Sequence, residues 1–217
     1  VLTLNDFRMR DVFILADDNN GEKTYYMYAT RQSYTADVFT SQDLLVWEKQ
    51  GQCFEYPKGF WGEETGQLWA PEVFKYKNPD NGETAYYMMV TTAKKDHVTT
   101  SSGSLIPMGT VILKADSPLG PFLPWSRTSD GIYGPVTPLP DRCLDGTLYV
   151  EDGIPYMVYS REYPVSWDYG AMNGAMYYIR LSNDLSCAAG APVYMFNAKE
   201  AANLSGLDSY VTDGPFM

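Results

Sequence analysis

Acidic residues recur along this chain at comparable intervals, and carboxylates that recur in a repeat can act together. Asp11, Glu72, Asp145 and Asp213 follow one another at separations of 61, 73 and 68 residues. Cleavage of a glycosidic bond needs a carboxylic acid that protonates the leaving oxygen and a carboxylate that activates water or attacks the anomeric carbon. The spacing therefore predicts acid–base chemistry, if the fold brings these residues together.

Local sequence suggests a different part for each acid. Asp11 follows Arg10 and precedes an apolar strand, so we expect a carboxylate beside a positive charge, as a general base requires. Asp145, in LDGT, would be a third carboxylate that raises the pKa of a neighbouring acid and orients it, although an Asp-Gly turn explains the same residues. Glu72, in WAPE, is predicted to have a structural role.

Several aromatic residues lie in glycine-rich loops and not in alternating strand patterns. Trp61, Trp69 and Trp167 are the candidates for substrate binding, because flat rings stack on the apolar faces of sugars. Core packing is the simpler interpretation for any one of them. As a set they favour a carbohydrate cleft.

The elements that must position these residues come from an internal repeat. RDVFILADDNNGEKTYYMYAT, APEVFKYKNPDNGETAYYMMVTT and LDGTLYVEDGIPYMVYSRE begin at Arg10, Ala70 and Leu144, and TDGPFM begins at Thr212. Each long segment reads as a β-hairpin, with apolar alternation on both sides of an Asn-, Asp- and Gly-rich turn. A second strand pair follows each hairpin, which predicts four-stranded blades whose first strands line the axis of a β-propeller.

Composition excludes several classes of partner. The 217 residues carry a net charge of −11, which disfavours nucleic acids and anionic membranes but not a neutral sugar polymer. Three scattered cysteines and the single His97 make neither a disulfide framework nor a metal cluster. We therefore assign no metal ligands and expect no required cofactor.

Five motifs in order resemble glycoside hydrolase family 43, the family of five-bladed β-propeller α-L-arabinofuranosidases and β-xylosidases. The matching stretches are MRDVFIL, LWAPEVFKY, ADSPLGPF, CLDGTLYVEDGIPYMVY and YVTDGPF. Each is weak alone, but together they span almost the whole chain. The resemblance implies an all-β, five-bladed propeller, with about three blades and the start of a fourth in residues 1–217.

The resemblance also implies an inverting mechanism, with Asp11 as the general base and Asp145 as the residue that modulates the pKa of the acid. The family has a Glu before Gly-Pro as its acid, whereas this chain has Asp213, so Glu200 is an alternative acid. Val12 stands where the family has Pro. Because a closed five-bladed ring needs roughly 300 residues, we expect a single domain that is incomplete at its C-terminal end.

Two other functions stay open at this stage. A retaining propeller glycosidase would need a nucleophilic Asp in an Asn-Asp-Pro setting, which Asp11 lacks, and a non-catalytic glycan-binding propeller would fit the departure at Asp213. Some family members carry a calcium ion, but His97 matches no such motif, so a structural calcium stays unassigned. An oligosaccharide or polysaccharide substrate implies a secreted or periplasmic protein.

Overall fold

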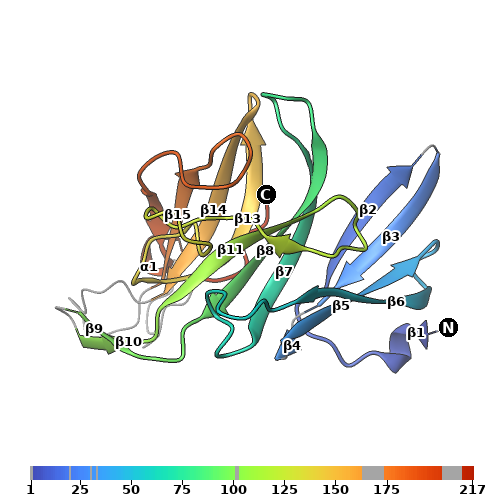
Figure 1. Ribbon diagram of the computed structural model, residues 1–217, viewed down its shortest axis with the longest axis horizontal. Coiled ribbons are helices and arrows are strands. Elements are labelled where there is room, and N and C mark those ends of the chain that lie inside the picture. Colours follow the sequence, from blue (N-terminus) through green and yellow to red (C-terminus); the bar gives the residue numbers. More distant parts are fainter. Residues whose placement is uncertain are drawn as a thin grey trace.

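The computed structural model describes residues 2–19, 21–29, 31–32, 34–100, 103–162, 174–201 and 212–217. Within these residues the chain is almost entirely β-structure, and three antiparallel blades follow one another along the longest axis of the molecule (Figure 1). The second and third blades are joined by one parallel pair into a single larger sheet. The helical elements are short: a 3₁₀ turn, η1 (Leu4–Asp6), and α1 (Ala198–Ala201). None of the described helices is long and apolar enough to span a membrane.

The first sheet is the N-terminal blade. Its strands are β2 (Phe13–Asn19), β3 (Glu22–Tyr28), β5 (Thr35–Ser41) and β6 (Val46–Glu55), with β1 (Leu2–Thr3) added at the β6 edge. Gly21, with φ of 87°, supplies the left-handed residue that the tight β2–β3 turn requires. The predicted hairpin and the strand pair after it are both present.

The second blade lies in the middle of the molecule. It contains β7 (Gln67–Lys77), β8 (Thr84–Ala93), β11 (Met108–Ala115) and the short β12 (Leu123–Pro124). A small hairpin, β9 (Val98–Thr100) and β10 (Gly103–Leu105), extends from the β8–β11 connection. The two-residue β4 (Arg31–Gln32) pairs with β7 and thereby joins the first blade to the second.

The third blade repeats the same order of strands. Its members are β13 (Arg142–Glu151), β14 (Ile154–Glu162), β15 (Ala175–Arg180) and β16 (Val193–Asn197). A single parallel pair, Met108 with Arg142, connects β11 of the second blade to β13 of the third. Residues 212–217 then return beside β13 and β14, because the Ser160 hydroxyl donates to the Thr212 carbonyl over 2.6 Å.

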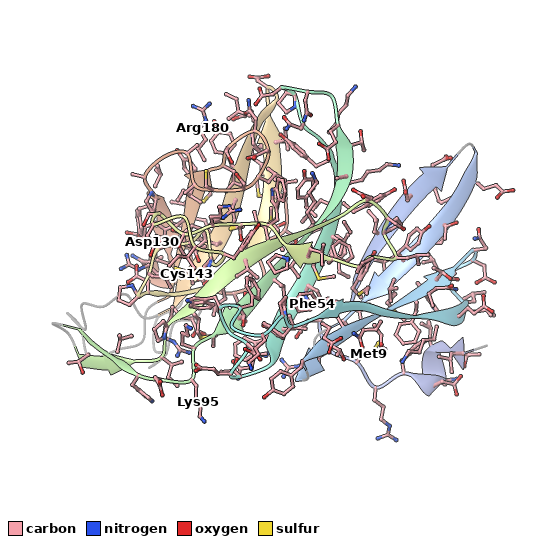
Figure 2. All side chains as sticks on the ribbon, in the orientation of Figure 1. Met9, Phe54, Lys95, Asp130, Cys143 and Arg180 are labelled. Atoms are coloured by element: carbon pink, nitrogen blue, oxygen red, sulfur yellow. The ribbon has the colours of Figure 1, made fainter. Side chains whose placement is uncertain are left out.

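Side chains from facing blades form two separate cores. Phe54, labelled in Figure 2, belongs to the core between the first two blades, with Tyr28 from β3 and Met88 and Leu113 from the second blade. The opposite face of the second blade contributes Met89 to a core shared with the third. Alternate residues of β8 therefore point to different neighbours, as a strand covered on both faces requires.

The first strands of the three blades lie beside one another. β2 contacts β7, and β7 contacts β13. Lys75 of β7 pairs with Asp17 of β2 at 2.7 Å, and Asp17 also accepts a hydrogen bond from Tyr86. Because Asp17 is only 4% exposed, this ion pair fixes how the first two blades meet.

The predicted fold class is confirmed. The chain is all-β, and it supplies three four-stranded blades and the first residues of a fourth from the predicted five-bladed β-propeller. The prediction of one domain over residues 1–217 stays a prediction. Of the segment beginning at Lys199, the helical turn α1 is described, and residues 202–210 lie outside the described part of the chain.

One sequence-based alignment was wrong, because Glu72 is not in phase with Asp145. Pairing of β7 with β8 breaks between Trp69 and Glu72, and pairing of β13 with β14 breaks between Leu144 and Thr147. These two bulges make Ala70 the counterpart of Asp145 and Glu72 the counterpart of Thr147. The longer β7–β8 hairpin concealed this offset in the sequence.

Candidate active site

A cavity of about 720 Å³ opens where the first strands of the blades begin. Its wall contains the three acids that the sequence analysis selected at strand starts: Asp11 from the first blade, Asp145 from the third, and Asp213 from the final segment. Residues more than 200 positions apart in the sequence thus share one space. The remaining wall residues include Trp69, Glu72 and Arg142.

Asp145 is held in place by its own backbone and by the second blade. It lies in the bulge of β13 and has a φ of 51°, a left-handed conformation that few non-glycine residues adopt. Its N–H donates to the Thr91 hydroxyl of β8 over 2.8 Å, and the N–H of Gly146 donates to Thr110 over 3.1 Å. Gly146 permits this approach, because an added Cβ would lie 2.6 Å from the sulfur of Met157.

Asp11 has a similar backbone but different surroundings. Its φ is 50°, and it precedes β2 as Asp145 occupies the start of β13. The side chain is 41% exposed, and the Arg10 guanidinium lies 3.9 Å from its carboxylate. Left-handed residues that are not glycine concentrate at functional sites, and aspartate tolerates this conformation better than most.

Asp145 and Asp213 form a carboxyl pair. Burial, followed by the neighbouring Asp213 carboxyl, raises the pKa of Asp145, whereas the backbone amides of Gly214 and Ala70 act in the opposite direction. The Gly214 N–H donates to Asp145 Oδ2 over 3.1 Å. Two adjacent carboxyls do not ionise together readily, so the pair retains a proton at a higher pH than an isolated aspartate would.

Glu72 also faces this cavity. Burial raises the pKa of its carboxyl to about 7, and the nearby Thr147 hydroxyl offsets only part of that rise. Oε2 of Glu72 is buried and has no hydrogen-bond partner among the described residues. The sequence analysis assigned Glu72 a structural role, and the structure instead places an unpartnered carboxyl in the cavity wall.

The predicted aromatic residues are divided among different places. Trp69 lines the cavity and packs against Ala93, Met108 and Leu144. Trp61 is half-buried against the core between the first two blades, with Lys94 Nζ 5.7 Å from its ring centroid, and is not among the cavity residues. Trp167 lies outside the described residues.

The alternative acid, Glu200, is placed elsewhere. It is exposed on α1 and does not belong to the residues that line the cavity. Its carboxylate accepts hydrogen bonds from the Tyr194 hydroxyl and the Asn197 N–H, and the first of these lowers its pKa most. A carboxylate stabilised in its ionised form is a poor proton donor, so the geometry favours Asp213 over Glu200.

The described residues do not fit a metal site. No group of three or more His, Cys, Asp or Glu side chains that could hold an ion occurs in the described ranges. His97 is exposed in the loop after β8, away from the cavity residues.

Two hydroxyl residues that position the site were missed. Thr91 of β8 accepts from the Asp145 backbone, and Ser160, its counterpart on β14, donates to Thr212 beside Asp213. The pairs Trp69 with Thr91 and Leu144 with Ser160 show that the two hydroxyls are equivalent. The recurrence of Thr or Ser after each Tyr-rich strand, as in MMVTT and YMVYSRE, is the signal that could have revealed them.

Fold and site together define a β-propeller with carboxylates gathered at one end of its inner strands. The sequence model of glycosyl hydrolases family 43 matches residues 6–217. The chain belongs to this family.

Solved structures agree with that assignment. An endo-arabinase from Bacteroides thetaiotaomicron is 32% identical, with a TM-score of 0.76 over 99% of this chain and 67% of that one. A thermostable family-43 glycoside hydrolase is 25% identical, with a TM-score of 0.65 over 87% of this chain and 53% of that one. An α-L-arabinofuranosidase from Lactobacillus brevis is 17% identical and shares the fold, with a TM-score of 0.56 over 87% and 53%.

The chain therefore spans about half to two thirds of the length of these structures. No curated protein sequence matches it.

Proposed function

We propose that the protein is an inverting glycoside hydrolase that acts on α-L-arabinofuranosyl or β-D-xylosyl linkages of plant-type polysaccharides or oligosaccharides. The observation that carries the proposal is the convergence of Asp11, Asp145 and Asp213 on one cavity. Hydrolysis with inversion needs a base and an acid on opposite sides of the sugar, with room for a water molecule.

Asp11 is the base in this proposal. Its side chain is 41% exposed, so the carboxylate is open to water, and it comes from a different blade than the other two acids. It accepts a proton from the water that attacks the anomeric carbon, while the C–O bond to the leaving group breaks.

Asp213 donates the proton that the leaving oxygen takes up. Its partner is Asp145, whose pKa is raised by burial and by the hydrogen bond with the Asp213 carboxyl, so Asp145 can pass a proton to Asp213. Asp145 therefore acts on the acid and not on the sugar. Trp69, at the cavity wall, provides a flat surface for the ring of the substrate.

Between the two linkages, arabinofuranosyl is the first choice. The endo-arabinase, at 32% identity and 99% coverage of this chain, favours an arabinan or an arabino-oligosaccharide as the substrate. We also propose that the protein is secreted or periplasmic, because a polysaccharide of this kind must be cut before it enters a cell.

The test is turnover by the full-length protein on linear arabino-oligosaccharides, xylo-oligosaccharides and the corresponding aryl glycosides. Proton NMR of the first-formed sugar reads the anomer, and inversion is expected. Retention of configuration would support a retaining mechanism instead. Binding of these sugars without any hydrolysis would support the glycan-binding alternative.

A further inference from the structure

Glu72 is a half-buried glutamate, and one of its carboxyl oxygens is buried without a hydrogen-bond partner among the described residues. It follows Pro71 in the bulged part of β7, so its backbone is stiff and its side chain leaves the inner strand of the second blade. The side chain reaches the same cavity as Asp11, Asp145 and Asp213. Oε2 is buried and finds no hydrogen-bond partner among the described residues.

The side chain next to it does not solve this problem. Thr147, the counterpart of Glu72 on β13, is fully buried; its hydroxyl lies close enough to the Glu72 carboxyl to lower its pKa, but it makes no hydrogen bond of normal length in the described part of the chain. Buried polar atoms in native proteins are nearly always hydrogen-bonded, and leaving one unpaired is destabilising. Glu72 thus keeps hydrogen-bonding capacity that the described protein does not use, and its side chain lines the cavity that a sugar would enter.

The protonation of Glu72 is suited to a neutral guest. With its pKa at about 7, the carboxyl is largely a neutral acid below neutrality, and it then offers one donor and one acceptor. A sugar hydroxyl is also both a donor and an acceptor. A cation would instead keep the carboxyl ionised, and a carboxylate-bearing guest would add charge to a wall that already holds three aspartates.

We propose that Glu72 is a substrate-binding residue that exchanges hydrogen bonds with a hydroxyl group of the sugar bound in the cavity, and so contributes to the choice of sugar. The inference rests on the proposed glycoside hydrolase function and specifies one contact within it. Glu72 takes no part in proton transfer to the leaving group, because Asp145 and Asp213 supply that proton.

The test is oligosaccharide affinity, measured by titration calorimetry in an Asp11→Asn background that prevents turnover. Glu72→Met keeps the volume of the side chain and removes its hydrogen bonds, and Glu72→Gln keeps a donor and an acceptor. We expect Glu72→Met to weaken the binding of arabino-oligosaccharides about 3- to 10-fold and Glu72→Gln to bind within about 3-fold of the parent. Glu64→Ala, an exposed glutamate outside the cavity residues, is the matched control.

Deoxy sugars provide a second measurement. A purely structural role of Glu72 would leave the difference in affinity between the full sugar and the deoxy sugar unchanged. The parent should bind one monodeoxy arabinofuranoside more weakly than the full sugar, and Glu72→Met should bind the two equally. If Glu72→Met does not fold, Glu72→Ala is used in the same comparison.

The outcomes separate the two proposals. Wild-type protein that hydrolyses oligosaccharides, together with a Glu72→Met variant of unchanged affinity and unchanged deoxy-sugar discrimination, overturns the role of Glu72 and leaves the proposed function intact. Wild-type protein that neither binds nor hydrolyses any of these sugars overturns both.

Discussion

Asp11 and Asp145 have nearly the same backbone and opposite surroundings. Their φ angles are 50° and 51°, and each stands at the start of an inner strand. Asp11 is 41% exposed beside Arg10, whereas Asp145 is largely buried between neighbouring blades beside Asp213. The repeated strand start thus fixes where a carboxylate points, and the neighbouring blades decide what that carboxylate can do.

The strongest way to break this comparison is to remove the exposed carboxylate. We expect Asp11→Asn to lower kcat by about 10³- to 10⁴-fold, because the attacking water loses its base. Asparagine tolerates the left-handed conformation, so the melting temperature should not change. Asp152→Asn is the control, since Asp152 has a φ of 51° in the β13–β14 turn and is not a cavity residue. Equal activity in both variants would rule out Asp11 as the base.

Asp213 tests the other side of the reaction. Asp213→Asn should lower kcat on oligosaccharides about 10²- to 10³-fold, because their leaving oxygen needs a proton. Aryl glycosides with acidic leaving groups should lose much less, since they depart without protonation. If Asp213→Asn keeps the wild-type ratio of the rate on oligosaccharides to the rate on aryl glycosides, Asp213 is not the acid. The same assay on Glu200→Gln tests the alternative acid.

Removal of the Asp145 carboxyl should have a moderate effect on the rate of hydrolysis. We expect Asp145→Asn to lower kcat about 10²-fold and to move the alkaline limb of the pH–rate profile to lower pH. The reason is that the proton of the pair is held less tightly once the neighbouring charge is gone. A pH–rate profile measured between pH 4 and 9, as a rough working range, checks this; an unmoved limb would mean that Asp145 does not influence the acid.

The same substitution should also change stability with pH. Burial and the Asp213 carboxyl raise the pKa of Asp145, so the wild-type fold loses stability as the pH rises from the usual range of an aspartate through the raised value. At neutral pH the free energy of unfolding of Asp145→Asn should therefore exceed that of wild type by about 1–2 kcal/mol, and its melting temperature should be higher. Both differences should disappear at acidic pH. Melting curves at several pH values check the sign.

A second effect on stability concerns the hydroxyl group that holds Asp145. Thr91→Val keeps the shape of the side chain and leaves the Asp145 N–H without its acceptor, which should cost about 1–3 kcal/mol in the free energy of unfolding. Denaturant melts measure it. Thr84→Val, at the exposed start of β8 and outside the cavity residues, is the control and should change stability by less than about 0.5 kcal/mol. Equal costs for the two variants would mean that this contact does not support the site.

The sequence predicted most of the fold, because each blade is built from local signals. The Asp-, Asn- and Gly-rich turns and the Tyr-rich strands locate the hairpins without reference to distant residues. Asp11, Asp145 and Asp213 were selected for the same reason, because each stands near the start of a repeated segment. The alignment of equivalent residues in neighbouring blades was harder to predict from the sequence.

The misalignment of Glu72 shows that difficulty. An offset of two residues keeps the alternation of a strand, so the sequence pattern around Glu72 looks the same in either alignment, and only the bulges of β7 and β13 decide between them. The unpartnered Oε2 of Glu72 depends on how two blades pack, and hairpin patterns carry no information about that. The same holds for the burial that raises the pKa of Asp145.

The hydroxyls of Thr91 and Ser160 each hold the first residues of the blade that follows. Asp145 and the segment that carries Asp213 are thus each anchored by the preceding blade. A hydrolase organised in this way carries an internal check on its assembly: a blade that docks out of place also misplaces the acid it brings, so catalytic competence and correct ring closure are gained or lost together.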